Sequence, residues 1–146
     1  MERLSLIGAD LLSETLKNID NLTAQPQDDS QATFAPIMHK SDGLIDWNLT
    51  ATEIFNRVRG FQPFPTSFTS FQNKKLTIWK TEVVETERLK KENAGRIVES
   101  GKNGIFVACG EGTILQVHEL QIEGKKRMSA RDFLNGIKVE IGEKLG

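Results

Sequence analysis

The sequence contains few of the residue types that build compact reactive sites. Its 146 residues include one cysteine, Cys109, and two histidines, His39 and His118. A single cysteine excludes an intrachain disulfide and a thiolate metal cluster. Cys109 ends the apolar run 105–109, so we expect a small buried side chain rather than a nucleophile. We expect His39 to be solvated in a polar segment and His118 to be a structural residue on a strand.

Long apolar runs and catalytic patterns are also missing. No run approaches the roughly 18 apolar residues of a membrane-spanning helix, and no secretory signal pattern opens the chain. A cytoplasmic protein is therefore expected. The carboxylates are scattered, neither histidine has an evident carboxylate or nucleophile partner, and no Gly-rich phosphate loop joins a strand to a helix. Metal ligands lack any useful spacing. We predict no catalytic, cofactor-binding or metal-binding residue in this chain.

The composition fits a globular protein, with 38% apolar and 27% charged residues. The chain length favours one main domain plus an appendage. Its net charge of −1 hides an asymmetry, because residues 1–43 carry three basic against seven acidic side chains and residues 44–146 carry sixteen against thirteen. A modest positive balance is not by itself a nucleic-acid signature, so a binding function has to be argued from clustering.

The first 43 residues contain an amphipathic helix and a polar segment. Apolar side chains recur at helical spacing at Leu4, Ile7, Leu11, Leu12, Leu16 and Ile19. This stripe has little nearby to pack on, so we interpret residues 1–20 as the last helix of a larger domain cut off upstream. The open alternative is that the helix packs back on the following domain. Residues 21–43 are interpreted as a linker in which 32–36 forms a short extended segment docked on a surface.

A short helix divides the chain. Thr50 and Glu53 form a capping-box pattern, and Gly60 stands where a helix C-terminus prefers glycine. The helical period places Ile54, Phe55, Val58 and Phe61 on one apolar stripe, with Arg57 and Arg59 on its margins. We therefore predict a helix that is anchored to a core and exposes two guanidinium groups.

Beyond this helix the apolar period becomes strand-like. We expect strands at 66–71, 75–84, 95–100, 105–109 and 113–122, a highly charged loop at 85–94, and a short final helix capped by Ser129. Five strands are too few for a stable open sandwich and suggest a partly closed barrel. The predicted fold class is mainly β with flanking helices (α+β): a small OB-like β-barrel, at 44–146, preceded by a helix and an extended linker.

Cations gather at three places in this second domain. Lys125, Lys126 and Arg127 directly precede the final helix, which itself carries Arg131. A phosphate would be attracted by these cations and by the free N–H groups of the first helical turn. Arg57 and Arg59 form the second group, and the hairpin lysines 74, 75 and 80 form the third. Ordinary solvated surface lysines are an equally good interpretation of the hairpin group. Together the groups could follow a phosphate backbone.

An ordered set of short motifs resembles one known family. The motifs are Pro26-Gln27-Asp28-Asp29, Ala32-Thr33-Phe34-Ala35-Pro36, Lys40, Asp42-Gly43, Ile45-Asp46-Trp47, Asn56-Arg57-Val58-Arg59-Gly60, Pro63-Phe64-Pro65 and Gly124-Lys125-Lys126-Arg127-Met128-Ser129-Ala130. In order and spacing, over nearly the whole chain, they resemble the C-terminal part of methionyl-tRNA formyltransferase. That family joins a Rossmann-like catalytic domain through a linker to an OB-like barrel. It transfers a formyl group from formyltetrahydrofolate to the methionine amino group of initiator Met-tRNA.

The resemblance implies a non-catalytic, tRNA-binding fragment. The family's catalytic residues and its folate-binding loop lie upstream of this chain, so the chain alone should be inactive. The positions that carry over as tRNA contacts are Lys40, Arg57, Arg59, Lys125, Lys126 and Arg127. Arg131 is a further predicted contact, from its place beside this basic turn. The implied partners are initiator Met-tRNA, through phosphate and sugar contacts, and the missing catalytic domain in cis. We expect a monomer that does not contact a membrane.

Two alternatives stay open at this point. The chain could be the structural C-terminal domain of a related sugar-nucleotide formyltransferase, although the 124–130 motif favours the tRNA branch. It could also be a stand-alone OB-like nucleic-acid-binding module, which the unpartnered first helix disfavours.

Overall fold

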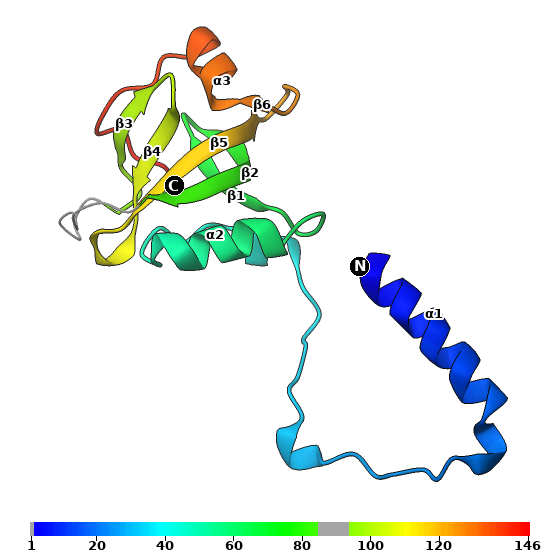
Figure 1. The fold of residues 1–146 in the computed structure, drawn as a ribbon. Coiled ribbons are helices and arrows are strands. Elements are labelled where there is room, and N and C mark those ends of the chain that lie inside the picture. Colours follow the sequence, from blue (N-terminus) through cyan, green and yellow to red (C-terminus); the bar gives the residue numbers. More distant parts are fainter. Residues whose placement is uncertain (1, 85–93) are drawn as a thin grey trace. The chain divides into compact units, whose positions relative to one another are not determined.

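The computed structural model describes residues 2–84 and 94–146 (Figure 1). The helices are α1 (Glu2–Lys17), α2 (Ala51–Gly60) and α3 (Ala130–Gly136), with short 3-10 turns η1 (Ile19–Asn21), η2 (Asp29–Gln31), η3 (Lys40–Gly43) and η5 (Gly110–Gly112). The strands are β1 (Ser67–Phe71), β2 (Lys74–Val84), β3 (Ile97–Gly101), β4 (Gly104–Ala108), β5 (Ile114–Ile122) and β6 (Met128–Ser129). The charged loop expected at 85–94 lies, apart from Ala94, outside the described residues.

The chain divides into two compact units, Met1–Pro36 and Ile37–Gly146. The first consists of α1 and a segment with little regular structure. The apolar side chains of α1 are exposed, from 52% for Ile7 to 69% for Leu4. In the segment expected to dock on a surface, Phe34 is 96% exposed. Within the described residues, no helix has the length and apolar character needed to cross a membrane.

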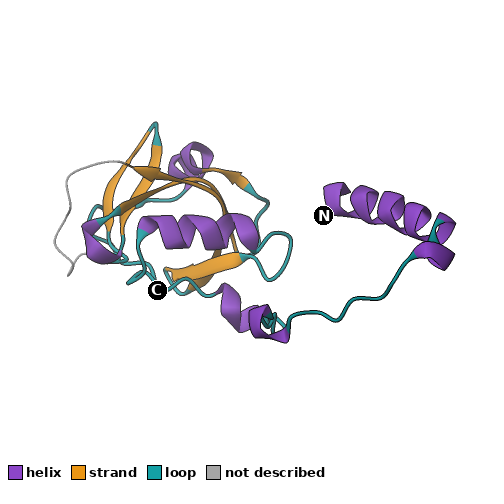
Figure 2. Cartoon of the chain, turned by 60° about the horizontal axis from the view of Figure 1, so that its bottom comes forward, coloured by secondary structure: helices purple, strands orange, loops and turns teal. Residues whose placement is uncertain are grey.

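The second unit is built on an antiparallel sheet with the strand order β1-β2-β5-β4-β3, and β6 adds to β5 (Figures 1 and 2). A two-residue turn joins β1 to β2, because Phe71 pairs with Lys74. Both turn residues, Gln72 and Asn73, have positive φ values, of 49° and 62°. This is the primed turn geometry whose twist matches that of the flanking strands. The hairpin expected from the sequence is confirmed.

The C-terminal segment bridges the two edges of the sheet. It pairs with the start of β3 through Ile97 N–H to Glu143 O (2.9 Å) and Gly142 N–H to Ile97 O (2.7 Å). Further along, Leu145 N–H donates to Gly95 O at 2.8 Å, and Gly146 N–H donates to the β1 carbonyl of Ser70 at 3.1 Å. The sheet is thereby closed into a small barrel.

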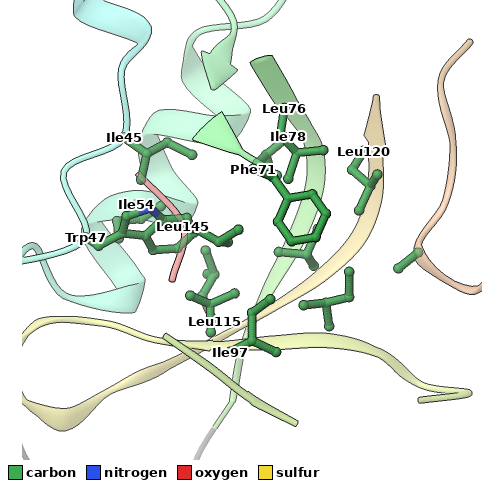
Figure 3. Close-up of a cluster of buried hydrophobic side chains, with 14 of the residues drawn as sticks. Ile45, Trp47, Ile54, Phe71, Leu76, Ile78, Ile97, Leu115, Leu120 and Leu145 are labelled. Carbon is green, nitrogen blue, oxygen red and sulfur yellow. The ribbon is translucent and has the colours of Figure 1, made fainter. Parts of the chain in front are cut away.

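The barrel encloses one apolar core, which also anchors two helices (Figure 3). The helix α2 buries Ile54 and Val58, as its predicted stripe requires. From α3, Phe133 contacts Phe71 edge-on, with ring centroids 5.8 Å apart. The indole N–H of Trp47 donates to Thr69 Oγ1 at 3.2 Å inside this core. The predicted fold class, a small OB-like barrel with flanking helices, is confirmed.

The turn between β4 and β5 does more than reverse the chain. Gly110 donates its N–H to Leu49 O at 2.8 Å, and Thr113 Oγ1 accepts the N–H of Ala51, the first residue of α2, at 2.8 Å. A Cβ atom on Gly110 would lie 1.8 Å from the carbonyl oxygen of Asn48. The close approach of this turn therefore fixes where α2 begins.

Candidate nucleic-acid interface

The helix α2 sets the positions of two predicted cations. The Thr50 hydroxyl accepts the N–H of Glu53 at 3.3 Å, and Glu53 Oε2 accepts the N–H of Thr50 at 2.8 Å, so the predicted capping box is present. Bonds from the Thr50 hydroxyl and N–H hold the pKa of Glu53 below its usual value. Arg57 and Arg59 then fall in the last turn, where the helix dipole favours cations.

Both guanidinium groups are exposed and lie beside aromatic rings. Arg57 is 6.0 Å from the ring centroid of Phe61, and Arg59 is 5.9 Å from that of Phe55. Arg59 also donates through Nε to Asn56 Oδ1 at 3.0 Å. These contacts stay along the helix surface, so charged groups of the last turn remain open to solvent.

Lys40 lies on an exposed turn next to this helix. Its turn, η3, ends at the buried Gly43, where a Cβ atom would meet Thr66 O at 2.0 Å. The residues after Lys40, including Asp42, line one narrow hollow together with Arg57 and Phe61. We call Lys40, Arg57 and Arg59 the helix cluster.

The second group of cations lies on the turn between β5 and β6. Lys125 N–H donates to Ile122 O at 3.0 Å, and the third residue of this turn, Gly124, has a φ of 79° that favours glycine. Lys125 and Lys126 follow as exposed residues. Arg127, also exposed, leads into β6, and Arg131 is exposed on α3. These four cations form the turn cluster.

The cap of α3 bonds one N–H group of its first turn and places a carboxylate there. Ser129 Oγ accepts the N–H of Asp132 at 3.0 Å and donates to the Asp132 carboxylate at 2.7 Å. The helix spans only seven residues. The cations of the turn, rather than the helix terminus, are therefore the groups open to a phosphate.

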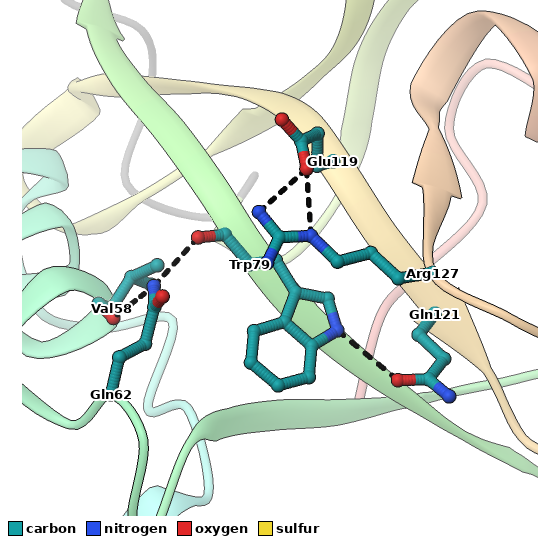
Figure 4. Close-up of polar contacts among 6 residues, drawn as sticks. All are labelled: Val58, Gln62, Trp79, Glu119, Gln121 and Arg127. Atoms are coloured by element: carbon teal, nitrogen blue, oxygen red, sulfur yellow. Dashed lines mark hydrogen bonds and ion pairs between the residues drawn. The ribbon is translucent and has the colours of Figure 1, made fainter.

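Arg127 differs from the other candidate cations because it is held by two neighbours (Figure 4). Its Nε and Nη2 atoms lie 2.7 and 2.6 Å from the same oxygen of Glu119. Its guanidinium carbon is 5.0 Å from the ring centroid of Trp79. Within residues 2–84 and 94–146, the other six predicted contacts form no ion pair with a carboxylate.

The pairing of β2 with β5 is irregular at two places near Trp79. Between the pairs Ile78–Leu120 and Lys80–Glu119, Trp79 is an extra residue on β2. Between Lys80–Glu119 and the next pair, Thr81–Val117, His118 is an extra residue on β5. A bulge leaves its extra residue outside the ladder and redirects side chains. The freed carbonyl of Trp79 accepts the side-chain amide of Gln62 at 2.7 Å.

The same tryptophan connects the two clusters (Figure 4). Towards α2, the Gln62 amide that reaches Trp79 O also donates to Val58 O, at 3.0 Å. Towards the turn, the indole N–H donates to Gln121 Oε1 at 3.2 Å, and Gln121 Nε2 donates to Lys125 O at 2.9 Å. We call Gln62, Trp79, Glu119, Gln121 and Arg127 the bridging network. Through hydrogen bonds it links Val58, which lies between Arg57 and Arg59, to Lys125 of the turn cluster.

The hairpin lysines extend this surface, and acidic residues interrupt it. Lys75 Nζ lies 4.0 Å from the ring centroid of Phe68, and Lys75 lines a shallow hollow with Gln121 and Glu123. Lys74 and Lys80 are exposed. Because Glu119 and Glu123 share this face, any attraction for a polyanion depends on which cations remain free.

The remaining reactive residue types have structural roles. His118 Nε2 lies 3.0 Å from Glu82 Oε2, as expected for a satisfied strand histidine. Cys109 is 1% exposed, and burial raises the pKa of its thiol to about 12. Within the described residues, no group of three His, Cys, Asp or Glu side chains could hold a metal ion.

Sequence reasoning did not single out Gln62, Trp79, Glu119 or Gln121. A signal was available for Trp79, which shares strand parity with Lys75 and Thr77 and therefore faces away from the core residues Leu76 and Ile78. No sequence signal gives the contact of Glu119 with Arg127, because it depends on the pairing of β5 with β6, in which Glu119 lies opposite Ser129.

The chain matches a known family and curated relatives. Residues 37–138 match the family described as formyl transferase, C-terminal domain. The methionyl-tRNA formyltransferase of Geobacter metallireducens is 46% identical over 99% of this chain and 46% of its own length. Those of Ruminiclostridium cellulolyticum and Alkaliphilus oremlandii are 40% and 44% identical, over 99% of this chain and 47% and 46% of their lengths. The resemblance drawn from the motifs is confirmed, and the chain spans about half the length of these relatives.

Solved structures support the fold. HypX from Aquifex aeolicus, in complex with tetrahydrofolic acid, superposes with a TM-score of 0.55 at 15% identity, covering 86% of this chain and 22% of that chain. A variant of the same protein gives a TM-score of 0.57 at 16% identity, covering 90% of this chain and 24% of that chain. At this identity the likeness concerns the fold alone.

Proposed function

From this chain's membership of the formyl transferase C-terminal domain family, we propose that it is the tRNA-holding part of a methionyl-tRNA formyltransferase. The whole enzyme would transfer a formyl group from formyltetrahydrofolate to the amino group of methionine on initiator tRNA. The formyl transfer itself would take place in the rest of the enzyme, since the relatives are about twice as long as this chain. We further propose that the protein is a cytoplasmic monomer.

The observation that supports this proposal is that the bridging network joins the segments that carry two groups of exposed cations. Arg57 and Arg59 lie at the end of α2, Lys125 and Lys126 lie on the turn before β6 with Arg131 on α3, and Lys40 is exposed on η3. Arg127 belongs to the same surface, although its guanidinium is bound to Glu119. Lysine and arginine side chains in such a row bind the phosphate backbone of RNA by charge and release its condensed counterions.

This mode of binding would read the shape of the tRNA rather than its bases. Double-stranded RNA has a narrow major groove that side chains cannot read, so proteins contact its phosphates and 2′-hydroxyl groups. Phosphate contacts fix register and orientation but carry no sequence information directly. Recognition of the initiator tRNA would therefore be shared with the rest of the enzyme.

The experiment is a binding titration of the chain with an initiator tRNA transcript over a range of salt concentrations. We expect weak binding that decreases steeply with salt. Reversing two charges, in Lys125→Glu/Lys126→Glu, should flatten the plot of log K against log salt by roughly 0.7–0.9 for each phosphate that is no longer neutralised.

A matched control is Lys102→Glu, which reverses a charge on the β3–β4 turn, outside both clusters. It should leave the slope close to that of the unaltered chain. If the chain does not bind tRNA even at low salt, or if the double variant keeps the original slope, the tRNA-binding role is wrong. A purely structural role for the barrel would then be favoured.

A further inference from the structure

We propose that Glu119, an acidic residue on the face assigned to RNA, is a positioning residue that strengthens RNA binding. This inference rests on the proposed function, since it concerns how the same surface presents its lysines. It runs against simple electrostatics, because a carboxylate beside a polyanion site should weaken binding. The contacts of Glu119 explain why we expect the opposite.

The first argument is that one oxygen of Glu119 fixes the orientation of Arg127. Two nitrogens of the guanidinium lie within 2.7 Å of this oxygen, and the group lies 5.0 Å from the indole of Trp79. Bonding to Glu119 and the cation–π contact with the Trp79 ring together leave the side chain little rotational freedom. Because its Nε and Nη2 atoms are already bonded to Glu119, Arg127 is less suited to bind a phosphate than Lys125 or Lys126.

The second argument is that the turn carrying the lysines is held at both ends by this network. At one end, the carbonyl of Lys125 accepts the amide of Gln121, which in turn accepts the indole N–H of Trp79. At the other end, Arg127 is tied to Glu119 on β5. Lys125 is itself the first attachment and Lys126 lies between the two, and among the described residues neither side chain forms an ion pair. Holding the turn in one conformation lowers the ordering cost when RNA binds.

The test compares two substitutions that remove the same charge from the same surface. Glu119→Gln breaks the ion pair with Arg127. Glu123→Gln is the matched control, because Glu123 adjoins the turn but its carboxylate accepts only the backbone N–H of Lys75, at 3.3 Å, among the described contacts.

For binding of an initiator tRNA transcript at low salt, we expect Glu123→Gln to strengthen binding by about twofold, the effect of one nearby charge in water. We expect Glu119→Gln to weaken it by about three- to tenfold, because it removes both the ion pair and the ring contact of Arg127. If both variants strengthen binding alike, Glu119 is merely a repulsive charge and the inference is overturned.

Arg127→Lys gives a second, independent comparison. Lysine keeps the positive charge but cannot present two fixed N–H groups to one carboxylate oxygen while lying flat on the indole. We expect it to weaken binding about as much as Glu119→Gln, and we expect the double variant to weaken it little further, because both changes remove one interaction. Full additivity, or unaltered binding by Arg127→Lys, would contradict the positioning role.

An NMR measurement without RNA separates this inference from the proposed function. The indole N–H resonance of Trp79, assigned by Trp79→Phe, should shift in Glu119→Gln and Arg127→Lys and stay in place in Glu123→Gln. The Trp47 resonance, whose N–H is bonded to Thr69 in the core, reports whether each variant is folded. If this pattern appears but no form binds tRNA, the proposed function fails while the network stands. If the Lys125 and Lys126 variants reduce tRNA binding but the Trp79 resonance does not shift in Glu119→Gln, the positioning role is wrong and the proposed function is not affected.

Discussion

Single residues decide which groups on this protein are available for binding. Arg127 is bonded to Glu119 and lies against Trp79, whereas Lys125 and Lys126 on the same turn are exposed and form no ion pair with any residue that the structure describes. In the core, burial keeps the thiol of Cys109 away from water and from soluble reagents. Whether a charged or reactive side chain can act therefore depends more on its immediate neighbours than on its residue type.

We expect the thiol of Cys109 to be unreactive in the folded chain. It is 1% exposed and its pKa is raised to about 12, so almost no thiolate forms near neutral pH. A thiol reagent such as dithionitrobenzoate should modify it only after unfolding in urea. Rapid stoichiometric modification under native conditions would show that this part of the barrel is open.

We also expect the capping box of α2 to make stability depend on pH. The folded-state pKa of Glu53 is lowered, chiefly by the Thr50 hydroxyl and then by the Thr50 N–H. A lowered folded pKa contributes stability that is present above the ordinary value of 4.5 and lost as the pH falls through the folded value. The gap in urea midpoint between the unaltered chain and Glu53→Gln should therefore be larger at neutral pH than below pH 4.5.

The control for this comparison is Glu99→Gln, at an exposed position of β3. Its urea midpoint should track that of the unaltered chain across the same pH range. A gap for Glu53→Gln that grows on acidification would contradict the capping role.

At the scale of elements, the barrel positions α2 through contacts with distant turns. In the β4–β5 turn, Gly110 donates its N–H to Leu49 O. Thr113 Oγ1 accepts the N–H of Ala51, the first residue of α2. The bulge at Trp79 leaves the backbone carbonyl of Trp79 outside the strand pairing. Gln62, which follows α2, donates its side-chain amide to this carbonyl. The helix cluster is thus placed from both ends of α2 by the sheet.

Gly110→Ala should destabilise the protein because its new methyl group would lie 1.8 Å from Asn48 O. Relieving such a clash costs about 1–3 kcal/mol or more. Gly101→Ala is the matched control, since nothing lies within 4 Å of a Cβ atom there. It should change the unfolding free energy by no more than about 0.5 kcal/mol. Equal urea midpoints for the two variants would contradict the close packing of this turn.

The elements themselves could be predicted from the sequence because their signals are local. Alternation predicted a strand at 75–84, and the Thr50–Glu53 and Ser129–Asp132 patterns predicted two helix starts. Local signals at Gly110 indicate only a turn between two strands, however. Its contact with Leu49 joins positions far apart in the chain, and no local pattern encodes such a contact.

The closure of the barrel and the bridging network could not be predicted for the same reason. Leu145 is buried, and its N–H bonds to Gly95, but the last residues show no strand-like alternation. The sequence grouped the cations by position along the chain. It could not show that Arg127 is paired with Glu119, because that contact depends on how β6 pairs with β5.

For the whole molecule, the central proposal is that one RNA engages both clusters. Two structural facts support this: both clusters are exposed, and the bridging network runs from Val58 through Trp79 to Lys125. An RNA that bound only the turn cluster would make no use of the two arginines at the end of α2. The number of phosphates neutralised by each cluster distinguishes these possibilities.

The most direct measurement is the salt dependence of initiator tRNA binding for four forms of the chain. These are the unaltered chain, Arg57→Gln/Arg59→Gln, Lys125→Gln/Lys126→Gln, and the combination of all four substitutions. We expect each pair to reduce the slope of log K against log salt by roughly 1.4–1.8, two phosphates each, and the combination to reduce it by the sum. If the combined variant shows the same slope as either pair alone, no single RNA engages both clusters, and the central proposal is wrong.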